Sequence, residues 1–182
     1  MTIMKIRFLF LTLFFTFCYA SIAQEDPYQE DIITYLNNNG TRDQYNNAYE
    51  SMFEVLKKQF AVSSVPETVW KDLQKDKEKS MDEIVNFLSF AYRNHFTHEE
   101  INAMNEFFST EAAKQMMKDP SKLNTSQKDE ISAFYASDLG IKIEKKKPEL
   151  SKDIMDISEH WSRDLFAAKM KSLIELGYST GY

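Results

Sequence analysis

Two stretches of the sequence, Phe107-Phe108-Ser109-Thr110-Glu111-Ala112-Ala113 and Phe134-Tyr135-Ala136-Ser137-Asp138-Leu139-Gly140, follow one pattern at an offset of 27 residues. In each stretch an aromatic pair precedes a hydroxyl residue, an acidic residue and a small final residue. A pattern that returns at a fixed offset indicates a repeated supersecondary unit. The sequence therefore predicts one structural unit that occurs twice, over residues 97–123 and 124–150.

We expect each unit to be a kinked pair of helices. The hydroxyl groups of Thr110 and Ser137 are placed to accept hydrogen bonds from amides that a bend would free. The aromatic pairs would fill the core, and the small residues Ala113 and Gly140 would let a neighbouring helix approach closely. Two exposed helix N-termini could instead hold an anion, but the acidic residue after each hydroxyl disfavours one.

The first 23 residues have the features of a secretory signal peptide. Two basic residues precede an apolar run over Phe8–Tyr19, and small residues stand before Gln24. This composition predicts cleavage between Ala23 and Gln24. The apolar run is too short for a comfortable membrane span, and we expect no transmembrane segment in the mature chain. Because the large Phe17 precedes Cys18, we expect no lipid anchor either.

Removal of this segment changes the net charge and the cysteine content of the chain. Two basic residues and no acidic residue are lost, so the net charge goes from −6 to −8. The only cysteine, Cys18, is lost as well. A cysteine-free mature chain has no disulfide, thiolate metal site or cysteine nucleophile. Its acidic balance argues against nucleic acid as a partner.

The rest of the chain is predicted to be all-α. It has few glycines and prolines, four of each in 182 residues, and its apolar residues recur at helical spacing. We expect a single domain of seven or eight helices over residues 24–178, with a tail at 179–182. A long C-terminal helix is expected beyond Pro148. Its apolar face is predicted from the following residues: Leu150, Ile154, Ile157, Trp161, Leu165 and Ala168.

Several helix starts are predicted from capping residues. Asp26 before Pro27 is typical of an N-cap with proline in the first turn. Pairs with the spacing of a capping box are Thr97 with Glu100, Ser80 with Glu83, and Ser126 with Asp129. In the helix after Ser80, Phe87 is expected on the buried face.

These motifs resemble a known family, the exported bacterial domains catalogued as domain of unknown function 2059 (DUF2059). The similar segments are His95-Phe96-Thr97-His98-Glu99-Glu100, Phe107–Lys114, Phe134–Lys142, Pro148-Glu149-Leu150 and Trp161–Leu165. The chain is also similar to members of Bacteroidetes type. The resemblance implies a helical fold and export to the periplasm, and it implies no catalytic residues. Ala113 in place of glycine and Phe108 in place of tyrosine depart from the pattern and affect the first kink.

Few residues are grouped in a way that suggests chemistry. His95, His98 and Glu99 are metal-ligand types that lie close together. Because Thr97 is a predicted N-cap, the two histidines would lie on either side of a helix junction, and we expect structural or surface roles for them. No cofactor is expected. Arg163 and Asp164, beside Trp161, would form either a surface contact or a buried ion pair that fixes helix register.

These features of the sequence lead to three hypotheses about function. We expect a non-catalytic exported module that contacts a protein partner in the periplasm. The alternative is an apolar small molecule or lipid held between helices, motivated by the nine Phe, eight Tyr and seven Met of the mature chain. A connected apolar cavity of roughly 300 Å³ or more would favour this alternative. A metal-dependent hydrolase that uses His95, His98 and Glu99 is the weakest hypothesis.

Overall fold

The structure is a computed structural model that describes residues 26–181. The predicted signal peptide, its cleavage site between Ala23 and Gln24, and Cys18 lie outside the described residues. Within residues 26–181 the chain is all-α and contains no strand, which confirms the predicted fold class. The helices are α2 (Pro27–Asn38), α3 (Thr41–Gln59), α4 (Glu67–Leu73), α5 (Lys77–His95), α6 (His98–Ser109), α7 (Glu111–Lys118), α8 (Thr125–Ala136) and α9 (Asp138–Glu175), with 3₁₀ turns η2 (Ala61–Ser63) and η3 (Pro120–Lys122).

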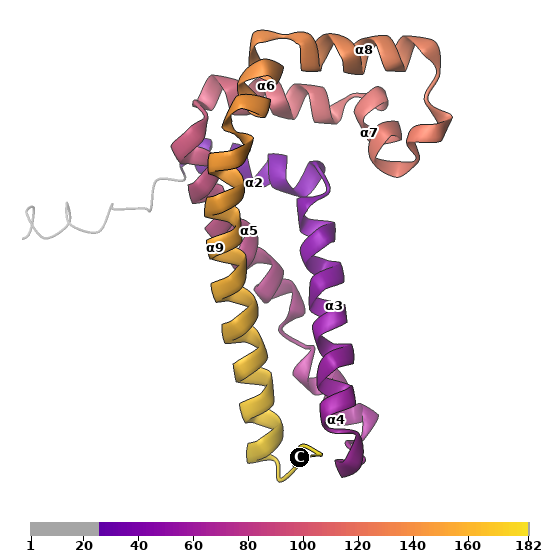
Figure 1. Ribbon diagram of the computed structural model, residues 1–182, viewed down its shortest axis with the longest axis vertical. Coiled ribbons are helices and arrows are strands. Elements are labelled where there is room, and N and C mark those ends of the chain that lie inside the picture. Colours follow the sequence, from indigo (N-terminus) through magenta and orange to yellow (C-terminus); the bar gives the residue numbers. More distant parts are fainter. Residues whose placement is uncertain (1–25, 182) are drawn as a thin grey trace, which may run out of the picture.

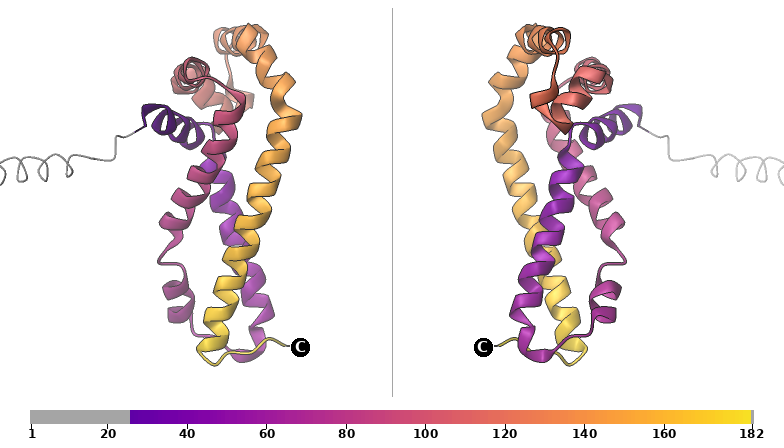
Figure 2. Two further views of the ribbon diagram at one scale, coloured as in Figure 1. Left: turned by 90° about the vertical axis from the view of Figure 1, so that its left-hand side faces the viewer. Right: turned by 90° about the vertical axis from the view of Figure 1, so that its right-hand side faces the viewer.

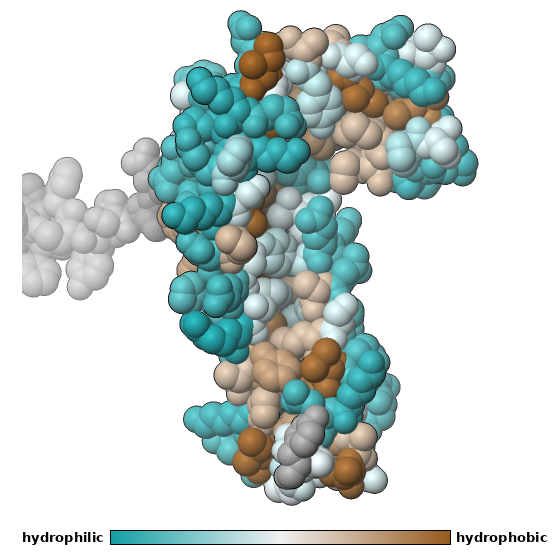
Figure 3. All heavy atoms as spheres, in the orientation of Figure 1, coloured by the Kyte–Doolittle hydropathy of each residue, from teal (hydrophilic) through white to brown (hydrophobic). Residues whose placement is uncertain are grey.

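The helices form an elongated body with an arm across one end (Figure 1). Helices α3, α5 and α9 run along the body, and α6, α7 and α8 lie across its upper end. Helices α7 and α8 pack against each other and project beyond the body as the arm. On the face shown in Figure 3, hydrophilic residues cover much of the body, and apolar residues gather along the arm and at the lower end.

Two hydrophobic clusters fill the body. The upper cluster joins α2, α5 and α6 with Leu150 of α9, and its fully buried members include Ile32, Leu36 and Met104. The lower cluster joins α3, α4, α5 and α9, and it contains the following residues: Tyr49, Phe53, Leu56, Phe60, Trp70, Met81 and Leu173. Trp161 and Tyr45 pack against both clusters, and their rings meet edge to face with centroids 5.5 Å apart. Helix α9 therefore connects two cores.

The duplicated kink is present in both copies. Thr110 ends α6 and caps α7, while Ser137 ends α8 and caps α9. Their backbone angles agree closely, with φ −70° and ψ 156° at Thr110 and φ −70° and ψ 163° at Ser137. Each hydroxyl accepts a hydrogen bond of 3.2 Å from an amide, that of Ala113 in the first copy and of Gly140 in the second. The prediction of a hydroxyl-capped kink is confirmed.

The aromatic pairs of the two copies contact each other. The rings of Phe107 and Phe134 are stacked with centroids 3.8 Å apart, and Phe107 is buried. Phe108 meets Tyr35 of α2 edge to face. Tyr135 is 40% exposed, so the second pair fills the core less than expected. The contact joins α6 to α8 at the base of the arm, which the repeat alone did not reveal.

Helix starts follow capping chemistry where the cap lies at the surface. The Asp26 carboxylate accepts from the amides of Tyr28 and Gln29. Thr97 and Glu100 form the predicted capping box. Gly40 has φ 84° between α2 and α3, a conformation that glycine adopts without strain.

Two predicted capping pairs are wrong. Helix α5 begins at Lys77, so Ser80 lies inside it and is buried. Helix α8 is capped by Asn124, whose side chain accepts from the Gln127 amide, and Ser126 is already helical. Asn124 supplies the side-chain cap of α8, whereas Asp76 at the start of α5 makes no capping hydrogen bond.

Pro148 does not separate a second unit from a later helix. It lies inside α9, which is continuous over 38 residues. Proline removes one helical hydrogen bond, but Pro148 is exposed, so water can satisfy the carbonyl it leaves free. Leu150 on the opposite side is buried in the upper cluster. The predicted boundary at Pro148 is therefore wrong, and the long helix starts at Asp138.

The residues predicted as a tail lie against the α3 end of the body. The amide of Ser179 donates to the Ser63 hydroxyl at 2.8 Å, and the amide of Gly181 donates to the Gln59 carbonyl at 3.2 Å. These bonds position the described end of the chain beside η2.

Candidate functional site

A groove with a volume of about 770 Å³ lies between α5 and α9. The left view of Figure 2 looks toward these two helices, which separate along the lower part of the body. We call this cavity the α5–α9 groove. Its lining includes the following residues: Asp76, Lys79, Glu83, Phe87, Phe90, Asp156, Ile157, His160, Trp161, Asp164, Leu165 and Lys169.

The inner surface of the groove is apolar. Ile157, Trp161 and Leu165 recur every four residues on α9 and are partly buried. From α5, Phe87 and Phe90 contribute side chains that are 52% and 51% exposed. The prediction that Phe87 faces the core is wrong, because its side chain is half exposed and lines the groove. Phe87 and Phe90 are three residues apart, so their rings lie on one face of α5.

An ion pair between buried Lys169 and half-exposed Asp76 lies at the lower end of the groove. The Nζ of Lys169 lies 2.6 Å and 2.7 Å from the two carboxylate oxygens of Asp76, and it also donates to the Leu73 carbonyl at 2.7 Å. Only 8% of the Lys169 side chain is exposed. A buried ammonium group needs such partners to offset its lost hydration. The pair joins α9 to the N-cap residue of α5.

The outer edge of the groove on α9 is acidic. Asp156, His160 and Asp164 follow one another at four-residue spacing and are exposed. Arg163 contacts the Asp164 carboxylate at 3.2 Å and His160 Nδ1 at 2.7 Å. The side chains of Arg163 and Asp164 are 57% and 72% exposed. Of the two predicted alternatives, the surface contact is confirmed and the buried ion pair is wrong.

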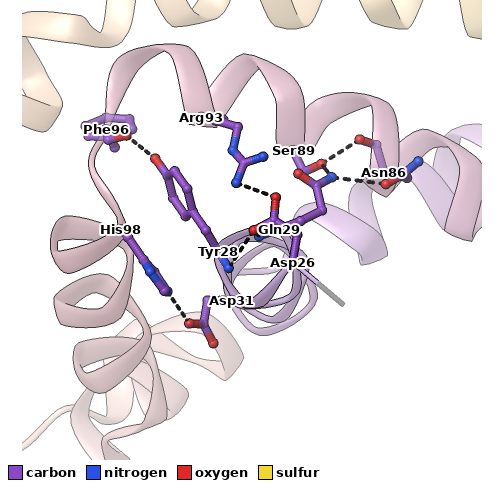
Figure 4. Close-up of polar contacts among 9 residues, drawn as sticks. All are labelled: Asp26, Tyr28, Gln29, Asp31, Asn86, Ser89, Arg93, Phe96 and His98. Atoms are coloured by element: carbon purple, nitrogen blue, oxygen red, sulfur yellow. Dashed lines mark hydrogen bonds and ion pairs between the residues drawn. The ribbon is translucent and has the colours of Figure 1, made fainter. Parts of the chain in front are cut away.

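The histidines proposed as metal ligands are paired with different carboxylates. His95, the last residue of α5, lies 2.7 Å from Asp153 of α9. His98, the first residue of α6, lies 2.6 Å from Asp31 of α2 (Figure 4). Glu99 is exposed, and hydrogen bonds from its own amide and from Thr97 lower the pKa of its carboxyl. In residues 26–181 no group of three or more metal-ligand side chains is placed to hold an ion.

A second polar cluster surrounds the start of α2 (Figure 4). The Tyr28 ring lies between the Arg93 guanidinium, 4.4 Å from its centroid, and the His98 ring, 4.9 Å away. Arg93 also contacts the Asp26 carboxylate at 2.6 Å and holds the pKa of that carboxyl below its usual value. The Tyr28 hydroxyl donates to the Phe96 carbonyl, and burial raises its pKa. The charges are paired and the aromatic faces covered, so we interpret this cluster as a clamp that holds α2 on α5 and α6.

The predicted motif residues are thus in two places. Those of the duplicated unit, from Phe107 to Gly140, lie at the base of the arm, and Trp161 lies in the groove. Three further residues of the groove, Asp76, Phe90 and Lys169, were not predicted from the sequence. A signal was present for one of them, because Lys169 interrupts an apolar stripe between Leu165 and Leu173. A lysine in such a stripe indicates a buried, paired ammonium group.

Comparison with known sequences finds a family match over residues 82–168. The model of the family described as "Uncharacterized protein conserved in bacteria (DUF2059)" matches residues 82–125 and again 120–168, and each match contains one copy of the aromatic motif. This is the family that the resemblance implied. No curated protein and no solved structure matched the chain. No helix of the described chain is both long and apolar enough to cross a membrane.

Proposed function

We propose that this protein is a non-catalytic binding module of the bacterial envelope, and that it binds a hydrophobic segment of a partner protein in the α5–α9 groove. The observation that carries the proposal is the groove itself, about 770 Å³ in volume and bordered by Phe87 and Phe90, each about half exposed. Removing apolar surface from water contributes roughly 25 cal/mol per Å². A partner that covers both rings would gain this contribution.

The surroundings of the groove favour binding over catalysis. The two charged groups at its lower end, Asp76 and Lys169, are bonded to each other. His160, the histidine at the rim, is exposed and contacts Arg163. General acid–base catalysis requires groups held together in reach of a substrate. Here the inner residues are apolar and the charged residues lie at the ends and edges.

A small apolar molecule is the second candidate ligand. The volume of the groove falls within the range of about 300–1,000 Å³ that is usual for small-molecule sites. It also exceeds the roughly 300 Å³ that a connected cavity for an apolar chain requires. A fatty-acid or lipid chain could lie against Ile157, Trp161 and Leu165.

Export is part of the proposal and has its own test. The predicted signal peptide would carry the chain across the inner membrane, with cleavage after Ala23. N-terminal sequencing of protein recovered from a periplasmic fraction should begin at Gln24. Protein that stays in the cytoplasm and begins at Met1 would contradict this part.

Site-specific photocrosslinking tests the binding site and separates the two candidates. A photoreactive phenylalanine analogue at position 90 should give an adduct in intact cells, because this side chain borders the groove. The matched control is Val55 on α3, which is 47% exposed and is not among the residues lining the groove. An adduct of several kilodaltons at position 90 alone supports a protein partner, and one of a few hundred daltons supports a small molecule. Equal labelling at both positions, or none at position 90, would contradict the groove as the binding site.

A further inference from the structure

We infer that the partner segment is an amphipathic helix with basic residues along the edge that faces α9. This inference rests on the proposed function of the α5–α9 groove and adds the chemistry of its occupant. Three observations carry it: the length of the groove, its walls, and the distribution of charge on its edges.

The length of the groove fits a short helix. Within α5 its wall extends from Lys79 to Phe90, and within α9 it extends from Asp156 to Lys169. At a rise of 1.5 Å per residue these walls are about 16 Å and about 20 Å long. A helix of three to four turns has the same length.

The walls present the contacts that a third helix needs. Two helices with apolar side chains at four-residue spacing form ridges and a groove into which another helix packs. On α9 these side chains are Ile157, Trp161 and Leu165. An amphipathic helix that places its apolar face in such a groove is a common mode of peptide recognition.

The charges of the groove select a basic partner. Its lining residues carry four carboxylates, of Asp76, Glu83, Asp156 and Asp164, and two ammonium groups, of Lys79 and Lys169. Lys169 is bonded to Asp76, and Lys79 lies 3.8 Å from Glu83.

Asp156 and Asp164 remain along the exposed α9 edge. Within residues 26–181, Asp156 has no ion-pair partner, whereas Asp164 contacts Arg163 in an exposed pair of the kind that contributes little. Lysine or arginine residues two turns apart on a bound helix would face both carboxylates. An acidic helix would be repelled at the same two positions.

The test uses Trp161 as a reporter in the intact mature protein. The Trp70→Phe variant leaves Trp161 as the only tryptophan of the chain. The probes are a helical peptide of about 14 residues with leucine on one face and lysine on its flanks, and a twin with glutamate in place of lysine. Palmitate is the small-molecule probe. Fluorescence titration and calorimetry give the affinities, and calorimetry detects binding that leaves the fluorescence unchanged.

We expect the lysine peptide to bind about tenfold more tightly than its glutamate twin at low salt, since two exposed ion pairs replace two repulsions. The difference in affinity between the two peptides should decrease at high salt, where exposed charges are screened. In the Asp156→Lys/Asp164→Lys variant the order of the peptides should reverse. Both carboxylates are exposed, so this variant should remain folded.

The other outcomes would contradict the inference, and they differ in what they imply for the proposed function. Equal affinities for both peptides, lost in the Phe87→Ser/Phe90→Ser variant, would keep the groove as a binding site and remove the basic partner. Binding of palmitate alone would assign the groove to a small apolar ligand. If neither peptide nor palmitate binds, the inference and the proposed function both fail.

Discussion

At the scale of single residues, Gly140 shows how little space the second kink leaves. A Cβ atom there would lie 2.5 Å from the carbonyl oxygens of Phe134 and Tyr135 and 2.6 Å from the Tyr135 Cα atom. These are backbone atoms, which cannot move aside without opening the bend. The close neighbour is therefore the C-terminal end of α8, the helix that directly precedes the bend.

The Gly140→Ala substitution should lower the free energy of unfolding by about 1–3 kcal/mol, as overpacking does. If the bend could relax freely, the same change would stabilise the helix by up to about 1 kcal/mol. Urea denaturation therefore distinguishes the two cases. A lower free energy of unfolding means that the bend is rigid, and a higher one means that it relaxes. The companion variant Ala113→Gly should also lose about 1 kcal/mol, because the Ala113 methyl is fully buried in the first kink.

Asp26 should make stability depend on pH at the acidic end. The hydrogen bond from Arg93 lowers the pKa of its carboxyl in the folded protein, whereas an unfolded aspartate titrates near about pH 3.9. The contribution of the charge is therefore complete above the unfolded pKa and is lost as pH falls through the folded pKa. Asp26→Asn keeps an N-cap but removes the charge.

The measurement is the free energy of unfolding of wild type and Asp26→Asn between pH 7 and pH 2.5. The wild type should be the more stable at neutral pH, and the difference should shrink as the solution becomes more acidic. A gap that stays constant over the whole range would show that the charge of Asp26 contributes nothing. Asp26→Ala, which also loses the cap, should keep part of its deficit at low pH.

At the scale of helices, the two kinks depend on one hydroxyl each. Thr110→Ala and Ser137→Ala should each lower the free energy of unfolding by about 1 kcal/mol, the usual value of an N-cap. Thr110→Ser should restore stability, because serine caps equally well. Ser109→Ala is the matched control, since Ser109 is exposed and donates only to the Glu106 carbonyl. Equal losses at positions 109 and 110 would contradict a specific capping role.

Local chemistry explains which helix features the sequence could predict. The repeat, the Thr97–Glu100 box and the Asp26 cap depend on residues close together in the chain, and the structure contains all three. Ser80 with Glu83 has the same spacing as Thr97 with Glu100, yet Ser80 is buried within α5. Burial is a property of the packed helices, so spacing alone could not separate these two cases.

The groove could be predicted only in part for the same reason. The apolar face of α9 through Ile157, Trp161 and Leu165 follows from helical periodicity. Part of this face is left uncovered because α5 diverges from α9. No pattern within one segment of the sequence predicts that divergence. The helical period consequently predicts a core position for Phe87 and gives no signal for Phe90 at the rim.

At the scale of the whole molecule, side-chain contacts join α5 to α9 at both ends of α5. His95 contacts Asp153 at the upper end, and Asp76 contacts Lys169 at the lower end. Between these contacts Trp161 packs against both hydrophobic clusters. The separation of α5 from α9 is thus fixed at two points, and the shape of the groove follows from them.

Lys169→Met tests the lower contact. The substitution removes the bonds to Asp76 and to the Leu73 carbonyl, and it should lower the free energy of unfolding by about 2 kcal/mol, the value of hydrogen bonds to a charged group. Lys171→Met is the matched control, because that side chain is 76% exposed and lies 3.8 Å from Glu175. It should change stability by less than about 0.5 kcal/mol.

The double-mutant cycle with Asp76→Asn separates the pair from general packing. If Lys169 and Asp76 act together, the two single losses should add up to more than the loss of the double variant. Trp161 emission, read in the Trp70→Phe background, should also shift in Lys169→Met, because the lower end of the groove would loosen around it. Additive losses with unchanged emission would mean that the pair does not shape the groove, and that the hydrophobic clusters alone hold α5 and α9 apart.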